Sequence, residues 1–168
     1  DDELVISEDN LLEEELTSKE KDVALNCLAF MAMSNSTQNT NKNILKNIGQ
    51  YYEADRVYIL ALAENNHVVT MMYEWTNENK YSIQRAVSGV RIEKFPFLCR
   101  CLQDKKPAFI KNKKELSGLY LNNGNSDDWC YTVIPIVTQK NFYLGFFCIE
   151  NPKIHQERIA LPTMMIKY

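Results

Sequence analysis

The chain has 168 residues, which is enough for one domain and short for two. Apolar residues make up 45% of it and charged residues 24%, as in soluble globular proteins, so the composition excludes a wholly disordered chain. Five glycines and five prolines exclude a collagen-like repeat. No apolar run reaches the roughly 18 residues that a transmembrane helix needs, so we expect no contact with a membrane.

Charge is unevenly distributed along the chain. Residues 1–22 carry ten acidic and two basic side chains, a net charge of −8, so the remaining residues carry +5. We predict that residues 1–17 form an acidic leader that is partly disordered or starts a helix. An acidic leader is unlike a secretory signal, and a charge of +5 is too small for a nucleic-acid-binding surface. We therefore expect a cytoplasmic protein without a nucleic-acid partner.

The five cysteines show no disulfide framework, which favours a reducing compartment. Cys99 and Cys101 form the only close pair. Two residues that are two apart on a helix point to nearly opposite sides, and the only histidines, His67 and His155, are distant in sequence. Because a structural zinc site needs four convergent ligands, we expect no metal, and we expect no cofactor.

Two helices are predicted after the leader. Ser18 is the candidate N-cap of the first helix, and Lys21 at its third position gives no capping box. The second helix is predicted from about residue 37 to 53, capped by Ser36 or Thr37. Apolar side chains recur at helical spacing in both: Val23, Cys27, Phe30 and Met31 in the first, and Ile44, Ile48 and Tyr51 in the second.

Strands dominate from residue 56 onward. Residues 56–63 and 67–75 are rich in strand-forming residues and are joined by Asn65-Asn66, which predicts a hairpin. The remaining predicted elements are a strand at 90–92, a helix at 95–102, a strand at 107–110, a helix within 111–121, strands at 130–137 and 142–149, and a last helix that begins near Pro162. This order predicts an α+β domain built on an antiparallel sheet.

From about residue 20 to residue 168 the chain resembles a GAF domain. The resemblance is greatest to GAF domains of bacterial signalling proteins that carry a diguanylate cyclase (GGDEF) output domain. It rests on an ordered set of segments: IGQYYEADRVYIL at 48–60, Tyr73-Glu74-Trp75, VIPI at 133–136 and LGFFCIENP at 144–152.

This resemblance implies a PAS-like, six-stranded antiparallel sheet with the N- and C-terminal helices on one face. It also implies a pocket on the other face, closed by short helices and loops, and a homodimer formed through the terminal helices. Residues 18–168 would then form the sensor domain. No GGDEF signature is present and the last helix has no stop signal, so we expect this helix to continue into a covalently linked output domain.

The candidate ligand-binding residues are aromatic, because small-molecule pockets are mostly apolar with a few polar groups. Tyr58 shares a strand face with Leu60 and Leu62, whereas Tyr73 and Trp75 share another. Ordinary core packing is the alternative interpretation for each candidate. The candidates are Tyr58, Tyr73, Trp75, Phe97, Trp129 and Tyr131.

The resemblance implies a non-enzymatic regulatory sensor domain that binds a small-molecule effector. One alternative is a ligand-free module kept for dimerisation. Another is a reductase of free methionine sulfoxide that uses Cys99 or Cys101, although the Gly-rich cysteine loop of those enzymes is missing. A bilin is not expected, because Tyr131 stands after Cys130 where bilin-binding relatives have a Cys-His pair. GAF domains that bind cyclic nucleotides carry an Asn-Lys…Phe…Asp-Glu signature. Asn112-Lys113 is only a lone fragment of it, so a cyclic nucleotide is not expected either.

Overall fold

The computed structural model describes residues 3–5, 15–111, 130–140 and 142–166. The predicted helix within 111–121 lies outside these residues. The described residues form seven strands and five helical segments, in this order: β1 (Glu3–Val5), α2 (Ser18–Met33), α3 (Thr37–Tyr52), β2 (Arg56–Ala63), β3 (Val68–Thr76), β4 (Val90–Arg91), the short 3₁₀ helix η1 (Ile92–Lys94), α4 (Pro96–Asp104), β5 (Ala108–Ile110), β6 (Tyr131–Val137), β7 (Tyr143–Glu150) and α5 (Ala160–Ile166).

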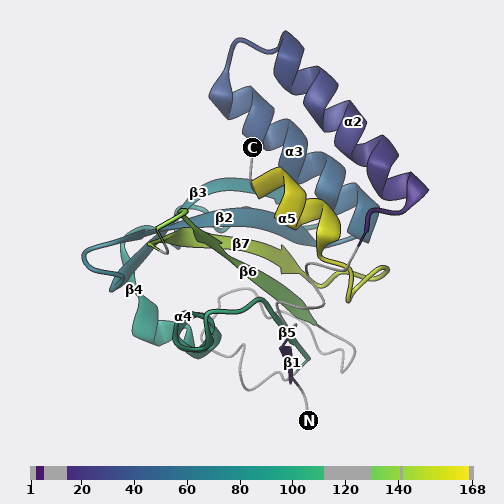
Figure 1. Cartoon of the computed structure of the whole chain (residues 1–168). Coiled ribbons are helices and arrows are strands. Elements are labelled where there is room, and N and C mark those ends of the chain that lie inside the picture. Colours follow the sequence, from purple (N-terminus) through teal and green to yellow (C-terminus); the bar gives the residue numbers. More distant parts are fainter. Residues whose placement is uncertain (1–2, 6–14, 112–129, 141, 167–168) are drawn as a thin grey trace.

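All strands join one antiparallel sheet in the order β1-β5-β6-β7-β2-β3-β4. Helices α2, α3 and α5 cover one face of this curled sheet, and α4 lies on the other side (Figure 1). The predicted α+β class, the antiparallel sheet and the placement of both terminal helices on one face are confirmed. The leader adds β1, which pairs with β5 and which the sequence does not predict.

The sheet separates two buried clusters. The helix-side cluster includes Ile48 of α3, Val57 of β2 and Phe147 of β7. The cluster on the other face includes Tyr58 of β2 and Phe97 of α4. Val57 and Tyr58 are neighbours on one strand and point to opposite faces, as the alternation of a strand requires.

The start of α2 differs from the sequence prediction. Thr17, not Ser18, is the N-cap: its hydroxyl accepts a hydrogen bond from the Glu20 backbone N–H at 3.2 Å. The Glu20 carboxylate in turn accepts from the Thr17 N–H at 2.8 Å, which completes a capping box. The expectation of no capping box was wrong, because it placed the helix start one residue too late.

The hairpin of β2 and β3 follows the prediction closely. Strand β2 has the predicted bounds, and β3 begins and ends one residue later than predicted. Asn65 and Asn66 lie in the left-handed region with φ of 56° and 67°, which asparagine tolerates better than most residues. The local turn chemistry therefore sets the register of this hairpin.

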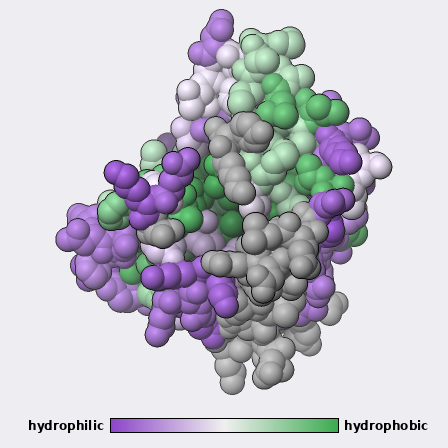
Figure 2. All heavy atoms as spheres, viewed as in Figure 1, coloured by the Kyte–Doolittle hydropathy of each residue, from purple (hydrophilic) through white to green (hydrophobic). Residues whose placement is uncertain are grey.

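Helix α2 exposes apolar side chains on its outer surface. Leu25 is 63% exposed, Met33 is 83% exposed and Phe30 is 38% exposed. Figure 2 shows apolar residues (green) gathered in the upper part of the molecule, where Figure 1 places α2, and hydrophilic residues on the left beside the β2–β3 turn. Among the described residues, none of the helices is both long enough and apolar enough to span a bilayer.

Candidate functional site

Three of the six candidate ligand-binding residues meet on the face of the sheet opposite the terminal helices. Tyr58 comes from β2, Tyr131 from β6 and Phe97 from α4. The two tyrosine hydroxyls are hydrogen-bonded to each other, and the Phe97 ring stands edge-on to the Tyr131 ring with centroids 4.9 Å apart. We call these three residues the aromatic cluster.

The aromatic cluster is packed as a core. Its three side chains are at most 1% exposed, and Cys148 of β7 lies opposite Tyr58 in the strand register. Burial raises the pKa of both tyrosines well above the usual value, so both hydroxyls stay protonated at neutral pH. Ligand binding by these residues stays a prediction, and a ligand on this face would have to contact rings that the protein already buries.

Tyr73 and Trp75 lie on the helix-covered face, away from the aromatic cluster. In the β2–β3 pairing, Ile59 stands opposite Tyr73 and Leu60 stands opposite Met71, which leaves Met72 as an extra residue. Such a β-bulge reverses the alternation of the residues that follow it. One pocket therefore cannot be lined by Tyr58 and by this pair together. The sixth candidate, Trp129, lies outside the described residues.

A buried ion-pair triad lies beside the aromatic cluster. Arg56 of β2 contacts the carboxylate of Glu74 of β3 at 3.1 Å and also contacts that of Glu150 of β7. Its remaining amino group donates to the Tyr81 carbonyl at 2.6 Å. All three charged side chains are at most 5% exposed. Glu74 also accepts from the Ile83 backbone N–H at 2.9 Å, so the triad fixes the segment after β3.

The triad was missed from the sequence, although a signal exists. Arg56 begins an otherwise apolar strand, and Glu150 ends another. A charged residue that completes an apolar strand needs an internal partner if it is buried. Burial raises the pKa of Glu150 to about 7, although Arg56 lowers it. Because Arg56 is held by two carboxylates and a carbonyl, the triad is suited to holding strands together and not to binding a ligand anion.

Comparison with known proteins identifies the fold. No protein-family model matches the chain, and no curated protein matches it. Among solved structures, the chain is similar to the GAF domain of a phosphoenolpyruvate-protein phosphotransferase from Acinetobacter, with 11% identity, a TM-score of 0.62, and coverage of 90% of this chain and 89% of that chain. It is also similar to the phycocyanobilin-bound GAF domain of a cyanobacterial phytochrome, with 13% identity, a TM-score of 0.64 and 92% of each chain covered.

This chain has the GAF fold. A third similar structure, residues 122 to 287 of a methyl-accepting chemotaxis protein, shares 13% identity with a TM-score of 0.55 over 87% of this chain and 90% of that chain. At these identities the structural similarity establishes the fold alone. The six strands predicted from the sequence all lie in the antiparallel sheet of this fold.

The thiols of this GAF fold are not activated. Burial raises the pKa of Cys101 to about 12, and burial also raises the pKa of Cys99. The Cys99 thiol donates to the Ile92 carbonyl at 3.3 Å. Reactive cysteines have a lowered pKa in an electropositive setting, which is the opposite condition. Among the described residues, no group of His, Cys, Asp and Glu side chains is arranged to hold a metal ion.

Trp75 borders a separate hollow at the end of α3. The hollow has a volume of about 550 Å³, and Gln50, Asn77 and Lys153 also line it. The Trp75 ring packs directly on the backbone of α3 at Gly49, where a Cβ atom would lie 2.2 Å from the ring. Glycine at this position therefore permits the contact that fixes the tryptophan.

Replacing Gly49 by alanine should destabilise this GAF fold by about 1 kcal/mol. Overpacking costs roughly 1–3 kcal/mol, whereas the better helix propensity of alanine returns about 1 kcal/mol. The ring should be pushed into the hollow, so in a Trp129→Phe background the fluorescence of Trp75 should shift to longer wavelength. Urea unfolding and emission spectra measure both effects, with Lys42→Ala as the control at an exposed position of α3 that does not line the hollow. A more stable Gly49→Ala protein would contradict the packing described.

Proposed function

We propose that this chain is a non-enzymatic regulatory sensor domain that binds a small-molecule effector. The effector would change the packing of the terminal helices and so control an output domain in the same polypeptide. We propose a diguanylate cyclase, which makes cyclic di-GMP, as that output, because the chain resembles the GAF domains of such proteins in the segments around residues 48–60 and 144–152. The raised pKa values of Cys99 and Cys101 support a non-catalytic role.

The observation that carries this proposal is the direct link between the two ends of the domain. Helices α2 and α5 lie on one face of the sheet. The Arg158 guanidinium, two residues before α5, donates to the Glu20 carboxylate of α2 at 2.5 Å, and Glu20 is fully buried. A ligand that prefers one arrangement of these helices shifts the population of that arrangement, which is the thermodynamic basis of a sensor.

The solved structures with this fold support small-molecule binding by analogy. One of them holds phycocyanobilin, and others belong to a phosphotransferase protein and a chemotaxis protein. Tyr58, Phe97 and Tyr131 remain the proposed contacts on the sheet face opposite the terminal helices, and Trp75 is a proposed contact in its own hollow. Tyr73 and Trp129 remain candidates from the sequence alone.

A thermal-shift screen with a metabolite library, together with mass spectrometry of small molecules that co-purify with the chain, tests this proposal. A ligand that binds only the folded state stabilises it by about 2.7 kcal/mol at a hundredfold excess over its dissociation constant. We expect at least one compound to raise Tm. If none does, the alternative of a ligand-free dimerisation module is favoured, which the exposed Leu25, Phe30 and Met33 of α2 support.

A further inference from the structure

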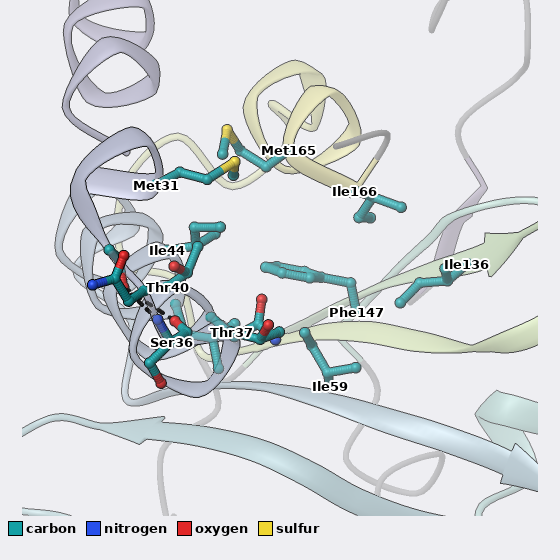
Figure 3. A pocket seen from close by; sticks show the side chains of 14 residues that line it. Met31, Ser36, Thr37, Thr40, Ile44, Ile59, Ile136, Phe147, Met165 and Ile166 are labelled. Atoms are coloured by element: carbon teal, nitrogen blue, oxygen red, sulfur yellow. Dashed lines mark hydrogen bonds between the residues drawn. The ribbon is translucent and has the colours of Figure 1, made fainter. Parts of the chain in front are cut away.

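A cavity of about 430 Å³ lies on the helix-covered face of the sheet, the face opposite the aromatic cluster. Figure 3 shows Ile59 and Phe147 rising from the sheet toward Met31 of α2 and Met165 of α5, with residues of the α2–α3 turn at one end. The lining residues that decide its chemistry are Met31, Thr40, Asn41, Ile59, Phe147 and Met165.

The lining has two chemically distinct parts. Its floor and roof are apolar, with Phe147 between the sheet and the two methionines (Figure 3). Its other end is a group of uncharged polar side chains from the α2–α3 turn and the first turns of α3, which includes Thr37 and Thr40. None of the lining residues carries a charge, so a charged ligand would lose its hydration without a counter-charge.

Several polar side chains at that end are available to a ligand. The turn itself uses Ser36, whose hydroxyl accepts from the Asn39 N–H at 3.2 Å, and Ser34, whose hydroxyl donates to the Ser36 carbonyl at 3.1 Å. Within the described part of the chain, the side chains of Thr40 and Asn41 make no hydrogen bond. Small-molecule pockets commonly combine apolar walls with a few such convergent polar groups.

We propose that this cavity binds a neutral, mainly apolar small molecule that carries a hydrogen-bonding group at one end. The apolar body would pack on Phe147 between Met31 and Met165, and the polar group would face Thr40 and Asn41. Its volume is within the range of about 300–1,000 Å³ that ligand pockets occupy. The cavity is separate from the effector contacts proposed at Tyr58, Phe97 and Tyr131, on the opposite face of the sheet. Its effect on an output rests on the proposed function, since a ligand in the cavity contacts α2, α3, α5 and the sheet at once.

The test uses the 168-residue chain with methyl-labelled isoleucine and methionine, titrated with 1-naphthol as the neutral probe. Methyl resonances of Met31 and Met165 should shift with a common dissociation constant, whereas those of Met71 and Ile110, which lie on the opposite face, should not. The matched charged probe, 1-naphthalenesulfonate, should bind at least tenfold more weakly. Shifts confined to the Met71 and Ile110 methyls, no shifts at all, or equal binding of the two probes would overturn the proposal.

A pair of variants on one strand tests the cavity directly. Ile59→Phe places a ring in the cavity from its sheet side. Leu62→Phe places the same ring on the other face of β2, where Leu62 packs against the buried cluster that contains Tyr58. Both positions are half-buried. We expect Ile59→Phe to weaken 1-naphthol binding at least tenfold and Leu62→Phe to change it less than twofold. Unchanged binding by a folded Ile59→Phe protein would overturn the proposal. If the Ile59→Phe protein does not fold, the methyl titration of the unsubstituted chain with 1-naphthol still tests the cavity proposal.

The two proposals fail in different ways. If a compound from the metabolite screen stabilises the chain while the Met31 and Met165 methyls respond to neither that compound nor 1-naphthol, the cavity proposal is wrong and the sensor function stands. If 1-naphthol binds between Met31 and Met165 while no compound of the metabolite screen raises Tm, the cavity proposal stands and the proposed sensor function fails.

Discussion

Replacing Arg56 by methionine should destabilise the fold by about 3–5 kcal/mol at pH 8. The change leaves the carboxylates of Glu74 and Glu150 buried without their cation, and removing one partner of a buried ion pair has this effect. Urea unfolding followed by circular dichroism measures the free energy of unfolding. Arg91→Met is the matched control, because Arg91 pairs with Glu93 at the surface, where such pairs contribute about 0–1 kcal/mol. Equal effects of the two substitutions would refute the role of the triad.

The penalty of Arg56→Met should grow with pH. Burial raises the pKa of Glu150 to about 7 from its ordinary 4.5, so the folded state binds this proton more tightly than the unfolded state. The stabilisation that protonated Glu150 contributes to the folded state is fully present below pH 4.5 and is lost as the pH rises through about 7. Without Arg56 the pKa of Glu150 rises further, so the variant continues to lose stability above pH 7. A constant difference between pH 6 and pH 9 would contradict this linkage.

Replacing Arg158 by methionine should destabilise the fold by about 2–4 kcal/mol at pH 7 and loosen the start of α2. Glu20 is fully buried and would keep its capping bond from Thr17 but lose the guanidinium that accompanies its charge. Arg158 also donates to the Glu15 carbonyl at 2.6 Å. Hydrogen exchange should therefore show lower protection of the first turns of α2, alongside the reduced free energy of unfolding.

This effect has its own control and pH dependence. Lys21→Met removes a cation from the exposed side of α2 and should change stability by less than about 0.5 kcal/mol. Burial raises the pKa of Glu20, but the Arg158 and Thr17 hydrogen bonds outweigh it, so the pKa is lowered overall. The pair's stabilisation is thus present above pH 4.5 and is lost as the pH falls through the lowered pKa. An Arg158→Met penalty that persisted undiminished in strong acid would be inconsistent with this pairing.

Local signals predict much of this fold. The Asn65-Asn66 turn and its flanking strand formers place the β2–β3 hairpin within one residue, because turn chemistry and strand propensity act over a few residues. Pro96 at the first position of α4 acts in the same way. The capping box of Thr17 and Glu20 is equally local, and one residue of error in the helix start was enough to hide it.

The candidate site was less predictable, since it depends on long-range pairing. The extra residue at Met72 sits in a run that is apolar on both faces, so nothing in the sequence marks the point where Tyr73 and Trp75 change faces. Arg56 and Glu150 are brought together only because β2 pairs with β7. The cavity on the helix-covered face likewise exists only where the α2–α3 turn, α5 and three strands converge.

Amide hydrogen exchange, with and without the compound that gives the largest thermal shift, tests the sensor mechanism most directly. If the effector acts through the terminal helices, protection should change in α2 (Ser18–Met33) and α5 (Ala160–Ile166), beyond any uniform increase from ligand binding. Changes confined to α4 and η1, or a uniform increase without any difference at the two terminal helices, would contradict the account.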